Sequence, residues 1–135
     1  MDPIDTNKII QIISRHIPEV VAIYLFGSAA TGDTNDDSDI DLAVLARQRL
    51  DPELAYALKT DLSIAFKRDI DLVDMLDADS VTAAQVILTG NLLFQSDSKA
   101  CGIFETSALG QYLQLNQERQ GILDDIEMRG SIYGR

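Results

Sequence analysis

Two short hydrophobic runs that both begin with the letters DIDL constrain the fold of this chain more than any other feature. The first is DIDLAVLA at residues 39–46, and the second is DIDLVDML at residues 69–76. Short apolar runs rich in branched side chains are typical of buried strands. Because the side chains of a strand alternate between its two faces, the paired aspartates of each run point the same way. The sequence therefore predicts two strands that carry carboxylates at one end.

The other segments predict an α/β fold, with helices flanking a small mixed sheet in a single domain. A further buried strand, VVAIYLF, is expected at 20–26, and NLLFQS predicts a short edge strand from residue 91. Apolar spacing and capping residues predict helices at residues 5–16, 51–66, 79–88 and about 103–128. A chain of 135 residues has room for one core. We expect one domain over 1–135, with its catalytic strands within about 20–76.

The last predicted helix carries a broken apolar stripe made of Leu109, Tyr112, Leu113, Leu123 and Ile126. We predict that this stripe packs against the core. Gly110, Gly121 and many glutamines interrupt it, so a partner-binding surface is the alternative.

The charge of the chain limits its partners. With 22 acidic and 11 basic residues, the net charge is −11, which repels the phosphate backbone of nucleic acids and suits a basic protein partner. No apolar run reaches the roughly 20 residues that span a bilayer, and the N-terminus lacks the pattern of a secretory signal. The single cysteine, Cys101, cannot form an internal disulfide. We therefore expect a cytoplasmic protein with no membrane contact, no direct nucleic-acid contact and a buried Cys101.

The candidate site begins where the first strand ends, at Gly27 and Ser28. Glycine lets a backbone approach a phosphate, and the short helical turn predicted at 28–31 would offer unpaired N–H groups to an anion. Asp39 and Asp41 follow ten residues later on the next strand. Two carboxylates on one face can hold a pair of divalent cations, and Mg²⁺ favours such a pair together with phosphate oxygens.

A third carboxylate would complete the site from the second DIDL run. It could ligate a metal ion and accept the proton of an attacking hydroxyl. We predict Asp71 for this role because it lies deeper in the strand, with Asp69 as the alternative. Asp74 falls on the other face and is expected to be structural.

This arrangement of motifs resembles the polymerase-beta-type nucleotidyltransferase superfamily. The shared pattern is G-S, a gap of ten residues, D-x-D on the next strand and a third aspartate on a later strand. The small size, with no second domain, resembles the minimal nucleotidyltransferase (MNT) branch, which includes the MntA-type antitoxins of HEPN/MNT toxin–antitoxin pairs. The resemblance covers about residues 20–76.

The resemblance implies a role for each motif residue. Gly27 and Ser28 would hold the β- and γ-phosphates of ATP. Asp39 and Asp41 would bind Mg²⁺, two ions in all, and Asp71 would complete the metal site and activate the acceptor hydroxyl. The implied function is that of a type VII-like antitoxin. It would transfer AMP from ATP to a tyrosine hydroxyl of a cognate HEPN ribonuclease toxin and so neutralise it.

One departure from the family pattern and two alternative functions remain. The family often has a basic residue where this chain has Thr31. The nearest basic residues, all expected to be solvated surface charges, are Arg47, Arg49, Lys67 and Arg68. His16 is expected only to end a helix. The alternatives are a catalytically silent antitoxin that inhibits by binding alone, and a nucleotidyltransferase for a small, aminoglycoside-like molecule.

Overall fold

Four helices and four strands make up the part of the chain that the structure describes. The computed structural model describes residues 4–27 and 39–132, with side-chain surroundings up to residue 124. In chain order the elements are α1 (Thr6–His16), β1 (Ala22–Phe26), β2 (Ile40–Leu45), α3 (Pro52–Phe66), β3 (Ile70–Asp74), α4 (Ser80–Thr89), β4 (Asn91–Gln95) and α5 (Ser98–Ile132). The predicted elements within these ranges are confirmed. The predicted turn at 28–31 lies outside the described residues.

The four strands form one mixed sheet in the order β3-β2-β1-β4. Strand β1 is antiparallel to both β2 and β4, whereas β2 and β3 are parallel. A parallel pair needs a crossover connection, and α3 supplies it. The C-terminal end of β1 and the N-terminal ends of β2 and β3 therefore meet at one end of the sheet, here called the carboxylate end. The predicted mixed sheet and the edge position of β4 are confirmed.

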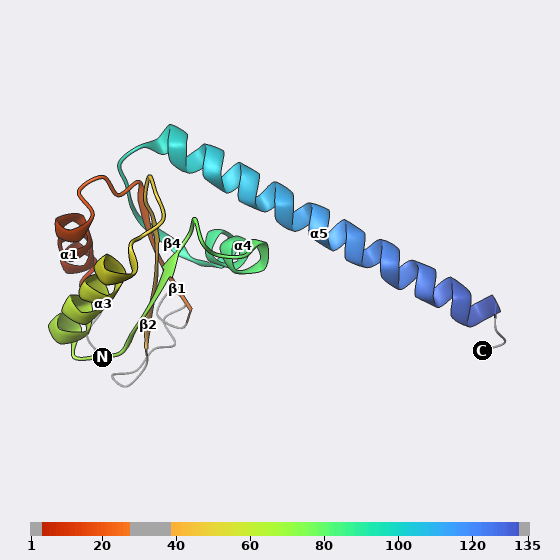
Figure 1. Ribbon diagram of the computed structural model, residues 1–135, viewed down its shortest axis with the longest axis horizontal. Coiled ribbons are helices and arrows are strands. Elements are labelled where there is room, and N and C mark those ends of the chain that lie inside the picture. Colours follow the sequence, from red (N-terminus) through yellow and green to blue (C-terminus); the bar gives the residue numbers. More distant parts are fainter. Residues whose placement is uncertain (1–3, 28–38, 133–135) are drawn as a thin grey trace.

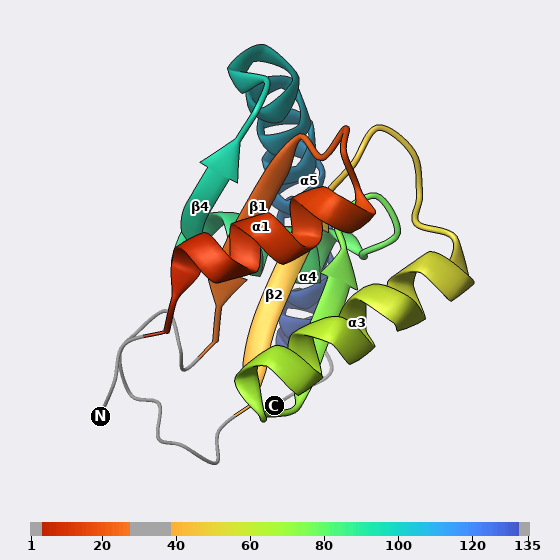
Figure 2. The same ribbon diagram turned by 90° about the vertical axis from the view of Figure 1, so that its left-hand side faces the viewer.

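The helices cover the two faces of the sheet as separate pairs (Figures 1 and 2). Alternating residues of β2 divide between the two layers, because successive side chains point to opposite faces. Ile40, Leu42 and Val44 pack in the cluster that includes α1 and α3. Ala43 and Leu45 pack in the second cluster, with residues of α4 and the first turns of α5. The sheet is therefore buried on both faces.

An aspartate precedes each of the four described helices, and Asp97 before α5 accepts a hydrogen bond from the backbone N–H of Ala100 at 3.0 Å. The Asp5 side chain accepts a hydrogen bond from the backbone N–H of Lys8 at 3.1 Å, and Asp79 accepts one from Thr82 at 2.7 Å. Asp51 precedes Pro52 at the start of α3 but makes no side-chain capping bond. Proline, which lacks a backbone donor and has a helical φ, marks this start instead.

Helix α5 is attached to the sheet near its N-terminal end. Its Cys101 is 1% exposed, as predicted for a buried cysteine. The Tyr24 hydroxyl of β1 donates a hydrogen bond to Glu105 Oε2 at 2.8 Å and lies 3.3 Å from Cys101 Sγ. Burial, and then these two neighbours, raise the pKa of Tyr24, so it remains a neutral donor. Beyond these contacts α5 still packs beside α4 through Ala108, and its C-terminal part then extends alone (Figure 1).

The predicted core packing of the C-terminal stripe is wrong for its outer residues. Leu113 and Leu123 are 60% and 58% exposed, while Leu109 and Tyr112 are half-buried. The side chain of Ile126 lies outside the described residues. The physical reason is the length of α5, whose 35 residues carry it past the sheet and past α4.

Two further expectations concern helix ends and membranes. His16 ends α1, as predicted, and its Nε2 lies 2.6 Å from Asp61 Oδ2 of α3, which ties the two helices together. Among the described residues, no helix combines the length and the hydropathy that crossing a bilayer requires.

Candidate active site

The predicted catalytic carboxylates meet at the carboxylate end of the sheet. Asp41 is the second residue of β2 and lies in register with Phe26 of β1 on one side and Asp71 of β3 on the other. Asp39 immediately precedes β2 and shares the face of Asp41. That face is the one covered by α4 and α5 farther along the strands, because Ala43 and Val73 pack there.

Gly27 lies directly against the carboxylate of Asp41. Its φ of +70° is in the left-handed region, and a Cβ at this position would overlap Oδ2 of Asp41 and lie 3.3 Å from Asp41 Cβ. Glycine is required here for two reasons, since other residues strain at this φ and a side chain would displace the carboxylate. The sequence pattern predicts only a phosphate contact for Gly27. A strand-end glycine before a D-x-D strand was the available signal for this second role.

The three carboxylates affect one another electrostatically. The pKa of Asp41 is raised above 3.8, first by partial burial, then by the negative charges of Asp71 and Asp39, and finally by a side-chain hydrogen bond with Asp71. Asp39 and Asp71 are exposed, whereas Asp41 is half-buried. The structure therefore brings Asp39, Asp41 and Asp71 into one cluster of like charges, which a cation would stabilise.

The donor chemistry of this cluster fits Mg²⁺. Carboxylate oxygens are its preferred protein ligands, and one or two carboxylates with phosphate oxygens and water complete its shell. Within the described ranges, no three His, Cys, Asp or Glu side chains are already posed to hold a metal ion. A cation beside Asp41 would offset the burial and the negative charges of Asp71 and Asp39 that raise its pKa.

The other aspartates of the second DIDL run have different positions. The carbonyl of Asp69 accepts a hydrogen bond from the N–H of Ile40 at 2.9 Å, and its side chain is exposed. Asp74 accepts hydrogen bonds from the backbone N–H groups of Leu50 at 2.8 Å and Leu76 at 3.1 Å. Asp74 thus holds two loops, which confirms the prediction that it is structural. Asp71, and not Asp69, is the residue that interacts with Asp41.

The predicted basic residues divide between the two ends of the sheet. Arg47 and Arg49 follow β2 at the far end, where they pair with Asp97 at 3.1 Å and Asp77 at 3.8 Å. Lys67 and Arg68 connect α3 to β3 and so precede Asp71 at the carboxylate end. Ser28, which is predicted to contact the phosphates, and Thr31, which stands where the family often has a basic residue, lie outside the described residues.

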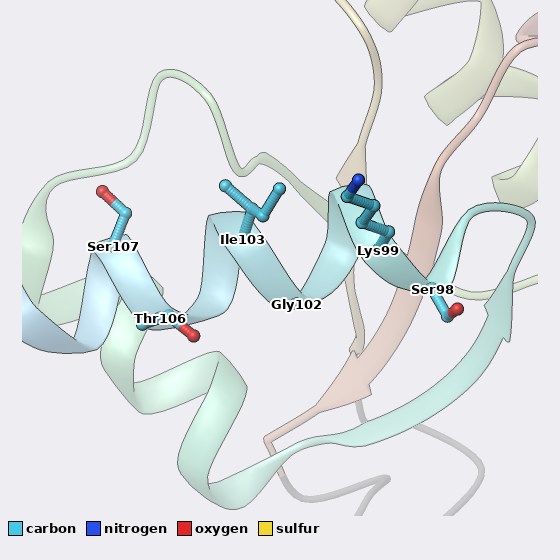
Figure 3. A pocket seen from close by; sticks show the side chains of 6 residues that line it. All are labelled: Ser98, Lys99, Gly102, Ile103, Thr106 and Ser107. Atoms are coloured by element: carbon cyan, nitrogen blue, oxygen red, sulfur yellow. The ribbon is translucent and has the colours of Figure 1, made fainter.

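A surface hollow on α5 is separate from the carboxylate cluster (Figure 3). Residues of α5 alone line it: Ser98, Lys99, Gly102, Ile103, Thr106 and Ser107. Lys99, Ile103 and Ser107 project from one side of the helix in Figure 3. A hollow formed by a single helix, without converging polar groups, lacks the character of a catalytic pocket.

Comparison with known protein families identifies the class to which this fold and cluster belong. The family model described as "Polymerase beta, Nucleotidyltransferase" matches residues 7–99, which include every predicted site residue. The chain therefore belongs to the polymerase beta nucleotidyltransferase family. The predictions of this fold and of a nucleotidyltransferase enzyme are confirmed at the level of the family.

Individual relatives extend the similarity to nearly the whole chain. The protein adenylyltransferase MntA of Shewanella oneidensis is 38% identical over 128 residues, which are 93% of this chain and 90% of that protein. A crystal structure of a toxin–antitoxin with AMP-PNP shows 37% identity and a TM-score of 0.81, covering 91% of this chain and 98% of its own. A structure of the tri-AMPylated Shewanella oneidensis HEPN toxin in complex with MNT antitoxin shows 36% identity and a TM-score of 0.73. It covers 90% of this chain and 94% of its own. The predicted resemblance to MntA-type antitoxins is confirmed.

Proposed function

We propose that this protein is a Mg²⁺-dependent protein adenylyltransferase that acts as a type VII-like antitoxin. It transfers AMP from ATP to a tyrosine hydroxyl of a cognate HEPN-domain ribonuclease toxin and thereby silences that toxin. The observation that carries the proposal is the cluster of Asp39, Asp41 and Asp71 beside Gly27. The similarity to MntA, which covers 93% of this chain and 90% of that protein, supports it.

The reaction is a displacement at the α-phosphorus of ATP. The acceptor oxygen forms a new bond to this phosphorus while the bond to the bridging oxygen of the β-phosphate breaks, and pyrophosphate leaves. Asp71 takes the proton of the acceptor hydroxyl, because it is exposed at the carboxylate end. Gly27, which has no side chain, leaves room for the Asp41 carboxylate and lets the triphosphate approach its backbone, and Ser28 follows it as a hydroxyl donor.

Metal ions would be held by Asp39, Asp41 and Asp71. Bound there, two Mg²⁺ ions would neutralise the triphosphate and stabilise the entering and leaving oxygens. The chain's own contribution is positioning, which suits a reaction with little covalent chemistry for the protein to perform.

A protein acceptor is favoured over a small molecule by the related complexes and by the charge of the chain. Related structures contain a toxin partner and an AMP-PNP nucleotide, and they share about nine-tenths of this chain. A net charge of −11 complements a basic, RNA-cleaving partner. The free, buried Cys101 is compatible with a reducing cytoplasm, where we place the reaction.

Intact-mass spectrometry tests this proposal. The HEPN-domain protein encoded beside this chain would be incubated with the chain, ATP and Mg²⁺, in parallel with an Asp39→Asn/Asp41→Asn double variant. We expect mass gains in steps of one AMP with the wild-type chain and none with the variant. A second series without Mg²⁺ should also give no gain.

Two other results would each indicate a different function. Tight binding without any mass gain would show a silent antitoxin that acts by occlusion. Transfer of AMP to an aminoglycoside, and not to the protein, would show a small-molecule enzyme.

A further inference from the structure

The inner face of α5 continues as an apolar stripe after the helix leaves the sheet. Cys101 and Ala108 of this face are buried, and Phe104 packs with them. At helical spacing the same face continues, beyond Ala108, through Tyr112, Leu115, Ile122 and Leu123, which we call the inner stripe. Ile122 is 61% exposed, and no other described element covers it. The inner stripe therefore has the apolar composition of a helix face that packs in a core, but its C-terminal part is exposed.

Apart from Leu109 and Leu113, the rest of this helical segment is mostly polar, and two pairs of its side chains are hydrogen-bonded along the helix. Gln114 donates to Glu118 at 3.4 Å, and Gln120 donates to Asp124 at 2.9 Å. These pairs run along α5 at i,i+4 spacing and lie off the inner stripe. The unmatched feature of the segment is therefore apolar, which is the pattern of a helix that docks into a groove of another protein.

The position of the inner stripe relative to the carboxylates suggests what it binds. Asp41 and Asp71 lie on the face of the sheet that α4 and α5 cover. Figure 2 shows α5 passing behind the sheet toward the level of the carboxylate end, and Figure 1 shows that it also extends away from the sheet, on the side of α4. A protein held on the inner stripe would therefore sit on the carboxylate side of the sheet.

We propose that the inner stripe of α5 is the docking surface for the HEPN-domain partner, and that it holds the acceptor near Asp71. This inference rests on the proposed function and names the surface that the partner uses. The related toxin–antitoxin structure leaves less than a tenth of this chain outside the match, so most of α5 belongs to the architecture shared with such complexes. A second copy of this chain is a poorer occupant, since each copy carries a net charge of −11.

A matched pair of variants tests the docking surface. Ile122→Glu places a charge on the inner stripe. Leu113→Glu makes the same type of change at an equally exposed residue, which is nine residues from Ile122 and so on the opposite side of the helix. Affinity for the purified HEPN-domain protein encoded beside this chain would be measured by calorimetry. Circular dichroism would verify that both variants keep their helix content.

We expect the inner-stripe variant to bind at least tenfold more weakly and Leu113→Glu to bind within twofold of the wild type. At partner concentrations that restore binding, the inner-stripe variant should still transfer AMP, because the carboxylate cluster is untouched. Equal affinity of the two variants would overturn the inference. So would sedimentation of the isolated chain as a dimer that only the inner-stripe variant dissociates.

Failure of the proposed function would look different. If the wild-type chain binds the partner through the inner stripe but adds no AMP, the docking surface stands and the adenylyltransferase does not. If AMP is transferred while the inner-stripe variant binds as tightly as the wild type, the adenylyltransferase function stands and the docking surface does not. A wild-type chain that does not bind the partner would overturn both.

Discussion

The backbone of Gly27 and the carboxylate of Asp41 lie in van der Waals contact at the carboxylate end of the sheet. Gly27 follows β1 in a left-handed conformation, and Asp41 extends from the neighbouring strand β2 into the space where a side chain at residue 27 would be. The Asp41 carboxylate can occupy this position because Gly27, which follows the neighbouring strand β1, has no side chain. Any side chain at residue 27 must move the group that we expect to bind metal.

Replacing Gly27 with alanine should therefore impair both stability and activity. The left-handed φ costs a non-glycine residue about 1–2 kcal/mol, and the new methyl group would displace the Asp41 carboxylate. We expect AMP transfer to fall by about 10²-fold, the scale of a misplacement of roughly 1 Å. Urea unfolding and intact-mass spectrometry would measure the two effects. Gly102→Ala is the control, because its Cβ would have open space, and it should stabilise α5 by about 0.5–1 kcal/mol without changing transfer.

Asp71→Asn and Asp69→Asn should separate the two candidates for the third carboxylate. Asp71 interacts with Asp41, whereas Asp69 contributes its backbone carbonyl to the sheet. We expect Asp71→Asn to reduce transfer by at least about 10²-fold, as for loss of a general base, and Asp69→Asn to stay within a few-fold of wild type. Initial rates at saturating ATP give the comparison. The opposite ranking would assign the role to Asp69.

Tyr24→Phe should loosen the attachment of α5 to the sheet. The variant removes the donor to Glu105 and leaves a half-buried carboxylate without that bond, at an expected cost of about 1–3 kcal/mol. Tyr56→Phe removes the hydroxyl of a tyrosine that is 74% exposed and should change the free energy of unfolding by less than about 0.5 kcal/mol. Chemical denaturation of both variants checks the prediction. Equal stabilities would mean that Tyr24 contributes through packing alone.

Asp79 should make the stability of the protein depend on pH in the acid range. Hydrogen bonds from Thr82, and from Val81, hold the pKa of Asp79 below 3.8 in the folded state. A lowered pKa means that its stabilisation is complete above the unfolded value and is lost as the pH falls through the folded value. Asp79→Asn keeps a side-chain acceptor for the cap but does not titrate. Its melting temperature should match the wild type near neutral pH and decline less below pH 3.8. If the melting temperatures of the variant and the wild type declined equally at acid pH, this role of Asp79 would be contradicted.

Much of the architecture could be predicted from local sequence because its elements are locally encoded. The branched residues of β1 and β2 predicted strands, and Pro52 and Gly90 marked the start of α3 and the end of α4. Alternation within β2 and β3 also predicted which aspartates share a face. The order of the strands could not be read in this way, since the register that aligns Asp41 with Asp71 joins segments 30 residues apart through a crossover.

The fate of the C-terminal stripe shows a second limit. A helix with apolar residues at i, i+3 and i+4 has the same pattern whether its own sheet or another protein covers it. Leu113 and Leu123 therefore looked like core residues in the sequence, although the structure exposes both. The two cases differ only in the tertiary structure: the sheet and α4 end before α5 does, so they cannot cover the C-terminal part of the stripe.

Residues 116–124 of α5 are all exposed, so this part of the helix depends on its own backbone hydrogen bonds. An isolated helix of 12–15 residues is only marginally stable in water. The amide protons of residues 116–124 should therefore exchange with solvent far sooner than those around Cys101. We expect this segment to melt and re-form while the sheet stays folded. Association with a partner would then include the cost of ordering a helix, so mutations that raise its intrinsic helicity would tighten binding without adding a single contact.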